Sequence, residues 1–434
     1  MTGLRHWWQE TRSSFWFVPG LIVAAAAGLA AALIGIDVSI DPLDARRWPL
    51  LLGAGAAGAR GLLTAVATSM VTVAGVVFSV TLVALSLASS QYTSRVLRNF
   101  MSDRVNQTVL GVFLGIFVYC LVVLRTLRGG DEGAFVPSLA VLGGLALAFV
   151  GIGFLIYFIH HISLSIQASN LIARVANETL ETIDRQFPDE LGPDDDEAGG
   201  STDAAALPPE AWRSIPALAS GYIESVDWHG LRDLVHDRHA IVRMERSVGD
   251  FVIEGAALVS VAGTSWSDSL TSRVNRIYAI GPQRTVQQDA GFGIRQLVDI
   301  AMRALSPGIN DSTTAVMCVD YLSAILARMT SRRISPAAAP GQGAVSVVAV
   351  GPSFETFLDL AFDQIRQNAE GNPAILVRLL EALETISGRI GNDRRRPAMR
   401  RHADLITVVA ARSIMPSERN AIEGILKRIE SVLP

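Results

Sequence analysis

The chain has 434 residues, of which 50% are hydrophobic and 18% charged, and its mean hydropathy is +0.35. This composition excludes a disordered or collagen-like chain and is atypical of a purely soluble protein. The net charge is −4, and an excess of acids is concentrated between residues 189 and 210, so no basic face for nucleic acid stands out. Charged residues are sparse in residues 1–162 and frequent afterwards, which predicts a membrane part followed by a water-soluble part.

Four uncharged apolar stretches are long enough to cross a hydrocarbon core, which requires about 20 helical residues. We expect helices at approximately 15–36, 62–89, 108–124 and 135–159, within a transmembrane domain at 15–162 that follows a cytoplasmic segment at 1–14. An even number of crossings puts both chain ends on the same side. The number of arginines in short loops differs by only one between the two sides of the membrane, so it gives little indication of the orientation. The large C-terminal region without signs of export chemistry favours cytoplasmic termini.

The second stretch has a polar side. Small hydroxyl residues allow helices to approach closely, and they also line wet paths through membranes. The stripe therefore predicts either helix packing or the wall of a conduit, and the sequence leaves both open. The hydroxyl residues fall within a sector of about 100° on a helix; they are Ser69, Thr72, Ser79, Ser86 and Ser90.

Small residues also form faces on the third and fourth stretches. Gly111 and Gly115 make a GxxxG motif, and Gly144, Ala148 and Gly151 lie on one side of the last stretch. Such faces serve close helix packing, either within one subunit or between the subunits of a homo-oligomer.

Polar residues mark the places where two helices leave the lipid. Gln91 and Arg95 follow the second stretch, and His160 and His161 end the fourth. Histidines at an interface are usually solvated or bonded to a carbonyl, and the alternative is a proton or metal role. The helical pattern then continues over 163–187, which predicts a rigid helix running unbroken from the fourth crossing into the water-soluble part.

The water-soluble part divides by composition and pattern. Residues 188–216 predict a flexible acidic linker. Residues 217–290 contain short strands, a helix at 228–237, and turns at Gly249 and Gly255, a pattern typical of small barrels. Residues 291–434 predict a helical subdomain. The expected fold is mainly α: a four-helix transmembrane region, then a cytoplasmic α+β domain with a small β-barrel-like part and a helical bundle.

Few residues suggest metal or cofactor chemistry. His229, Asp233 and His236 share a predicted helix face, which suits either a divalent cation or plain solvent exposure. The cysteines form no spaced motif, and Lys427 is the only lysine, so no zinc site, phosphate loop or Schiff-base lysine is indicated. There is also no GxSxG motif. We expect no cofactor and no catalytic residue, and an enzyme is the least favoured class.

Three stretches together carry a resemblance to a known family. VVFSVTLVALSLASSQYTSRVLRNFMSD, FIHHISLSIQ and RTVQQDAGFGIRQLVDIAMRALSPGINDSTTAV resemble the bacterial predicted membrane proteins grouped as domain of unknown function family 2254. The family has proline where Ser94 and Ser312 stand here. The resemblance implies a multi-helix protein of the bacterial inner membrane with a C-terminal cytoplasmic domain, and it brings no assigned activity.

Polar residues crowd the most specific of these stretches. Such a cluster either ties structural elements together through hydrogen bonds and ion pairs, or forms a ligand pocket. The cluster consists of Arg284, Gln288, Asp289, Arg295, Asp299, Asn310 and Asp311.

These features favour an oligomeric channel or transport-like protein with a cytoplasmic regulatory domain. The alternative is a membrane-anchored sensor or scaffold whose soluble domain binds a protein or a small ligand. The expected partners are the lipid bilayer, further copies of the chain, and an ion or small ligand, but no nucleic acid.

Overall fold

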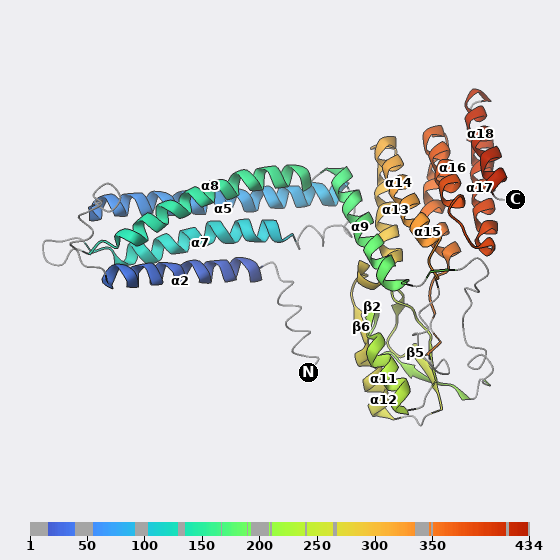
Figure 1. The fold of residues 1–434 in the computed structure, drawn as a ribbon, viewed down its shortest axis with the longest axis horizontal. Helices are drawn as coiled ribbons and strands as arrows, with labels where there is room; N and C mark the ends of the chain where they lie inside the picture. Colours follow the sequence, from blue (N-terminus) through green and yellow to red (C-terminus); the bar gives the residue numbers. More distant parts are fainter. Residues whose placement is uncertain are drawn as a thin grey trace. The chain divides into compact units, whose positions relative to one another are not determined.

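The computed structural model describes two compact units, Met1–Gln167 and Ala168–Pro434. The first unit is helical, and the second combines helices with two small sheets (Figure 1). The described residues are 16–39, 55–91, 103–128, 135–165, 167–188, 190–191, 208, 211–238, 241–263, 267–334, 347–348, 350–413 and 416–432.

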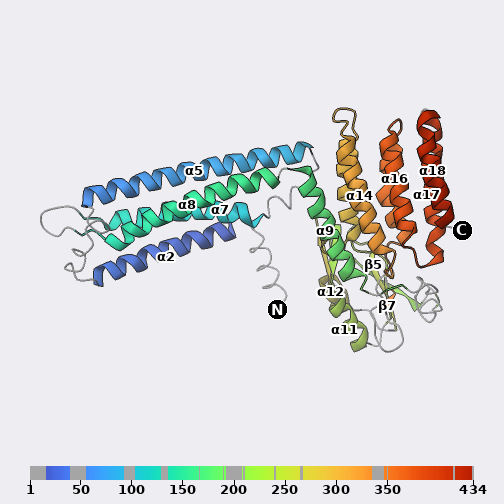
Figure 2. The same ribbon diagram turned by 45° about the horizontal axis from the view of Figure 1, so that its top comes forward.

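Four long helices make up the described part of the first unit. All four are long and apolar enough to cross a membrane, which confirms the four expected spans with ends shifted by a few residues. Figures 1 and 2 show them side by side along their lengths. Their bounds are α2 (Phe17–Ser39), α5 (Ala56–Gln91), α7 (Arg104–Thr126) and α8 (Ser138–Ser165).

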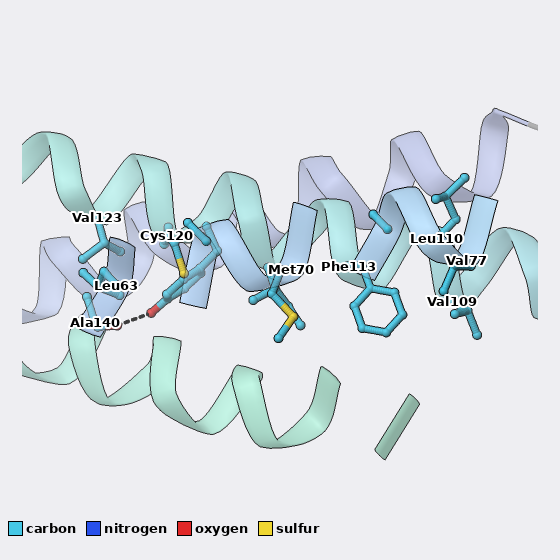
Figure 3. Packing of buried hydrophobic residues seen from close by; sticks show 14 of the residues in the cluster. Leu63, Met70, Val77, Val109, Leu110, Phe113, Cys120, Val123 and Ala140 are labelled. Carbon is cyan, nitrogen blue, oxygen red and sulfur yellow. Dashed lines mark hydrogen bonds between the residues drawn. The ribbon is translucent and has the colours of Figure 1, made fainter. Parts of the chain in front are cut away.

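Helix α7 is the central helix of this unit, since it packs against α2, α5 and α8. Figure 3 shows apolar side chains of α5, α7 and α8 in this core, among them Met70, Phe113 and Ala140. The buried Tyr119 hydroxyl donates a 2.7 Å hydrogen bond to the carbonyl of Ala140. Its polar oxygen is therefore not left unpaired in the apolar interior.

The predicted small-residue faces are used for contacts within the chain. A Cβ on Gly111 would lie 2.9 Å from both Ile22 and the backbone of Pro19 in α2, and one on Gly144 would lie 2.7 Å from Leu63 in α5. Because there is no room for a side chain at these positions, the glycines allow the helices to approach this closely.

The helix expected to run unbroken past the fourth span is interrupted. Helix α8 ends at Ser165, and a separate helix, α9 (Ala168–Gln186), belongs to the second unit. At the break, the Ser165 hydroxyl donates to the carbonyl of His161 at 2.9 Å, and the N–H of Gln167 bonds three residues back to Leu164 at 3.3 Å. These two hydrogen bonds take the place of the regular backbone bonds between residues four apart, as is common at a helix end.

The helical part of the second unit follows the apolar periodicity of the sequence. Ile294, Leu297, Val298 and Ala301 lie on one side of α13 and are buried. Helix α13 packs against α9, α14 and α15, while α14, α16 and α18 are successive neighbours (Figure 2). The bounds are α13 (Ala290–Ala304), α14 (Ser312–Met329), α15 (Phe354–Asn368), α16 (Pro373–Ser387), α17 (Arg396–Ser413) and α18 (Pro416–Val432).

In its described residues, the β-rich part contains two sheets and two helices around one core. The four-stranded sheet has the order β1-β5-β3-β7, with β7 parallel to β3, and the three-stranded sheet has the order β4-β2-β6. Ile223, Leu231, Val242 and Val259 are among the buried core residues. The elements are β1 (Arg213–Pro216), β2 (Gly221–Val226), α11 (Trp228–Arg238), β3 (Ile241–Met244), β4 (Phe251–Val252), β5 (Ala257–Ala262), α12 (Asp268–Ile277), β6 (Tyr278–Gly281) and β7 (Val347–Val348).

The prediction of a barrel-like part is wrong. Within the described residues, no strand of one sheet pairs with a strand of the other, so both sheets stay open and keep their edges. The predicted turns are confirmed, because Gly249 and Gly255 have φ of +91° and +82° in the turns on either side of β4. Strand β1 lies at the end of the segment expected to be linker and pairs with β5.

Candidate functional site

A cavity of about 590 Å³ lies in the second unit, where the helical and β-rich parts meet. Its wall comes from the end of α9, the turn after β3, the 3₁₀ turn η2 (Val286–Gln288) with the start of α13, residues 350–352, and α15. The side chains that line it include Arg185, Phe187, Trp228, Gln288, Asp289 and Phe357.

The end of α9 holds the segment that enters α13. The Thr182 hydroxyl donates to the carbonyl of Val286 at 3.0 Å. The Gln186 amide donates to the carbonyl of Gln288 and accepts the N–H of Ala290 at 3.3 Å. Gln288 in turn accepts the N–H of Val226 in β2 at 3.0 Å. The backbone groups at the cavity wall are therefore hydrogen-bonded by side chains from both the helical and the β-rich part.

Arg284 and Asp289 form a bidentate ion pair at this junction. Arg284 donates from Nε to Oδ2 at 2.8 Å and from Nη2 to Oδ1 at 3.0 Å, and Asp289 also caps α13 by accepting the N–H of Phe292 at 3.0 Å. Burial raises the pKa of the Asp289 carboxyl, while Arg284 and the Phe292 N–H act in the opposite direction. The pair packs on Gly249, where a Cβ would collide with the Asp289 carboxylate.

The structure brings together three of the seven residues of the polar cluster, namely Arg284, Gln288 and Asp289. Arg295 donates from Nη1 to Gln364 Oε1 on α15 at 2.8 Å, and Asp299 lies further along α13.

The remaining two cluster residues lie at the far end of α13. Asn310 has φ of +49° in the turn that follows α13. Asp311 caps α14 by accepting the N–H of Thr314 at 3.0 Å, and the hydrogen bonds from Thr314 lower the pKa of this carboxyl. These two residues shape a turn between helices and do not reach the cavity.

A run of arginines at residues 394–401 lies in the 3₁₀ turn η3 (Asp393–Arg395) and at the start of α17. Arg395 is 3% exposed. Its guanidinium donates to the carbonyls of Met329, Thr330 and Arg332 at 2.7, 3.0 and 2.8 Å. Arg395 therefore satisfies the carbonyls that are left free at the end of α14.

The hydroxyl residues of α5 face away from the other helices of the first unit. Ser69, Thr72, Ser79 and Ser86 are exposed, whereas the residues of the opposite side are buried. Those buried residues are Ala59, Leu63, Ala67, Met70, Ala74, Val77 and Ala84. The side chain of Ser90 lies outside the described residues.

The membrane-exit residues do not gather in one place. His161 Nε2 lies 2.7 Å from Asp103 Oδ2, whereas His160 is exposed on α8. Gln91 is the last residue of α5, and its side chain, like the whole of Arg95, lies outside the described residues.

The weak metal candidates lie on α11. His229 and Asp233 are exposed, and the side chain of His236 lies outside the described part. Among the described residues, no group of three or more His, Cys, Asp or Glu side chains is arranged to hold a metal ion.

Most of the cavity lining escaped the sequence analysis, including Arg185, Gln186 and Trp228. The signal that could have found this junction is on α9, where the hydroxyl residues Thr179 and Thr182 interrupt the apolar face formed by Ile172, Val175 and Ile183. Polar groups on a buried helix face need partners on the neighbouring element.

Comparisons with known proteins place the chain beside proteins without an assigned activity. The family model described as "Predicted membrane protein (DUF2254)" matches residues 12–385. Uncharacterized proteins of Mycobacterium bovis and Mycobacterium tuberculosis are 35% identical over 434 residues, which cover 97% of this chain and 81% of each relative. No solved structure matches the chain.

Proposed function

The chain belongs to the DUF2254 family of predicted membrane proteins, and we propose that it is an oligomeric channel or transport-like protein of the bacterial inner membrane. In this proposal copies of α5 line a wet path, and the second unit regulates the path from the cytoplasm, where both chain ends lie. The path carries an ion or a small polar solute.

The exposed hydroxyl side of α5 carries this proposal. On a helix the exposed hydroxyls and the buried residues of α5 occupy opposite sectors, each about 100° wide. Ser69, Ser79 and Ser86 make no hydrogen bond within the described residues, and a hydroxyl without a partner is costly in hydrocarbon. Only Thr72 is satisfied within its own helix, by donating to Thr68 at 2.8 Å. A water-filled path shared by several copies supplies the missing partners.

The length of α5 also supports a role at the centre of an assembly. Its 36 residues extend to about 54 Å at 1.5 Å per residue, against about 30 Å for the hydrocarbon core. A helix of this length either tilts or projects beyond the lipid. Turns that project beyond the lipid would give the lining helix a water-exposed end on which a regulator can act.

Flux and crosslinking test this proposal together. In liposomes we expect ion flux that Ser79→Leu and Ser86→Leu each reduce severalfold, since a larger apolar side chain narrows and dries the path. Val71→Leu is the matched control, because Val71 is exposed on α5 outside the hydroxyl sector. A Ser79→Cys variant should form disulfides between subunits, whereas Val71→Cys should not. A bilayer that stays tight with the wild-type protein contradicts the proposal.

A second candidate function is a membrane-anchored sensor, favoured by the cavity of about 590 Å³ in the second unit. Cavities of about 300 to 1,000 Å³ are typical of small-molecule sites. In this case the hydroxyls of α5 serve only for helix packing and line no path. The protein would then bind its ligand without making the bilayer permeable to ions.

A further inference from the structure

We propose that this cavity binds an organic anion with an aromatic body. The inference names the ligand class of the sensor candidate and rests on that second function. It requires no ion conduction through α5.

The walls of the cavity favour a planar apolar body. Phe187 and Phe357 meet edge to face with ring centroids 6.2 Å apart, and Trp228 contributes a third aromatic side chain from α11. Met244 and Val248 add apolar surface from the β-rich part. Aromatic rings prefer stacked or edge-on contacts with one another, so an aromatic ligand gains more here than an aliphatic one of similar size.

The charge at the cavity favours an anion. Asp289 is the one carboxylate among the described lining residues, and Arg284 and the Phe292 N–H already occupy its oxygens. Arg185 uses Nη2 to donate to the Thr182 hydroxyl at 3.0 Å, and its Nε and Nη1 make no bond to any described residue. Among the described lining residues, the wall therefore presents an available cation and no available carboxylate.

The uncommitted polar groups of the wall are mostly donors. Gln288 uses its Oε1 to accept the N–H of Val226, and its Nε2 makes no bond within the described residues. The indole N–H of Trp228 and the hydroxyl of Ser247 are likewise without a bond to any described residue. Donors without internal partners suit a ligand rich in acceptor oxygens, such as a carboxylate or sulfonate.

Equilibrium dialysis of the full chain in lipid nanodiscs tests the proposal, with empty nanodiscs as the blank. The probes are naphthalene-2-sulfonate, its neutral isostere naphthalene-2-sulfonamide, and the aliphatic anion octane-1-sulfonate. We expect naphthalene-2-sulfonate to bind about tenfold more tightly than either of the others, because only it uses both the cation and the aromatic wall. Equal binding of the sulfonamide or of octane-1-sulfonate overturns the assignment, as does the absence of binding above the blank.

Variants locate the site. Arg185→Gln should weaken binding of naphthalene-2-sulfonate about tenfold, the effect of losing one charge-assisted hydrogen bond. Trp228→Leu should weaken it severalfold, and Arg174→Gln, the same change on α9 away from the cavity, should leave it unchanged. Circular dichroism confirms that each variant is folded, and Arg185→Lys should restore part of the affinity. Wild-type affinity in folded Arg185→Gln overturns the proposal. Because dialysis measures no flux, its failure leaves the channel proposal untouched.

Discussion

His161 near the end of α8 lies 2.7 Å from the carboxylate of Asp103, the residue that caps α7. The other oxygen of Asp103 accepts the N–H of Val105 at 2.9 Å. One carboxylate thus serves both as the cap of α7 and as the link to α8, although 58 residues separate it from His161.

This double role predicts energetic coupling between the two residues. Asp103→Ala should destabilise the first unit by about 1 kcal/mol or more, the usual effect of a lost N-cap. A double-mutant cycle with His161→Ala should give a coupling energy of about 0.5 kcal/mol or more, measured by denaturant titration in mild detergent. His160→Ala is the matched control, since His160 is exposed on the same helix. Purely additive effects of Asp103→Ala and His161→Ala would show that the contact is not energetically significant.

The turn at Gly249 predicts a second effect, on the Arg284–Asp289 pair. Gly249→Ala and Gly255→Ala both force alanine into a left-handed conformation, which costs about 1–2 kcal/mol. A Cβ at Gly249 would collide with the Asp289 carboxylate, whereas a Cβ at Gly255 would meet no atom of the described residues within 4 Å. Gly249→Ala should therefore lower the free energy of unfolding more than Gly255→Ala. The difference between the two variants should be smaller in an Asp289→Ala background. A difference of the same size in both backgrounds would contradict the collision between the Cβ and the carboxylate.

The crossing of α9 and α13 predicts a third effect. A Cβ on Gly293 would collide with the hydroxyl of the buried Thr179 on α9. Gly293→Ala should destabilise the second unit by about 1–3 kcal/mol, typical of overpacking, and Thr179→Ala in the same chain should recover part of the loss. Gly388→Ala is the control, since its nearest atoms would lie at ordinary contact distances of 3.6 and 3.8 Å. The thermal midpoint of the second unit's unfolding is the measurement, and a loss with Gly388→Ala as large as with Gly293→Ala would argue against tight packing at this crossing.

The buried His402 predicts a pH dependence of stability. Its side chain is 0% exposed, with Nε2 2.7 Å from Asp359 and Nδ1 without a hydrogen-bond partner among the described residues. Burial lowers the pKa of His402 from its ordinary value of 6.5, although Asp359 and Asp363 oppose the shift and Arg401 adds to it. The unfolded chain therefore binds the proton first as pH falls.

The direction of the change in stability with pH follows from this difference in proton binding. The stabilising contribution of neutral His402 should be complete above about pH 6.5 and should decrease as the pH falls from there through the pKa of the folded state. Urea titrations between pH 7.5 and 5 should show a smaller decrease in unfolding free energy for His402→Gln than for the wild type. His229→Gln, at an exposed histidine, should follow the wild type. A wild-type slope in His402→Gln would assign the pH dependence to other groups.

Local patterns in the sequence were sufficient for most helices. Uncharged apolar runs predicted the four spans, because a hydrocarbon core excludes charge over a defined length. The helical character of residues 291–434 was expected from their apolar periodicity. In contrast, α12 was missed among the strands, although Ser267 caps it and Leu270, Val274 and Ile277 make an apolar stripe. Its ten residues are too few for periodicity to outweigh neighbouring strand signals.

The sequence did not show which distant strands and side chains pair with one another. The strands predicted a barrel, but whether a sheet closes depends on which distant strands exchange hydrogen bonds, and strands from the two sheets do not pair within the described residues. The burial of Arg395 was likewise not predicted, because charged side chains are usually exposed. Its partners, the carbonyls at the end of α14, lie more than 60 residues earlier in the chain.

The amino-acid sequence by itself determined the membrane-spanning helices and the helical character of the C-terminal region, because hydrophobic length and 3.6-residue periodicity act locally along the chain. Only the tertiary structure decided that Asp289 lies at a cavity while Asp311 lies at the other end of α13. It also decided that the hydroxyls of α5 face outward from the helices of their own unit. Both outcomes depend on which faces of distant elements come into contact, and no local pattern contains that information.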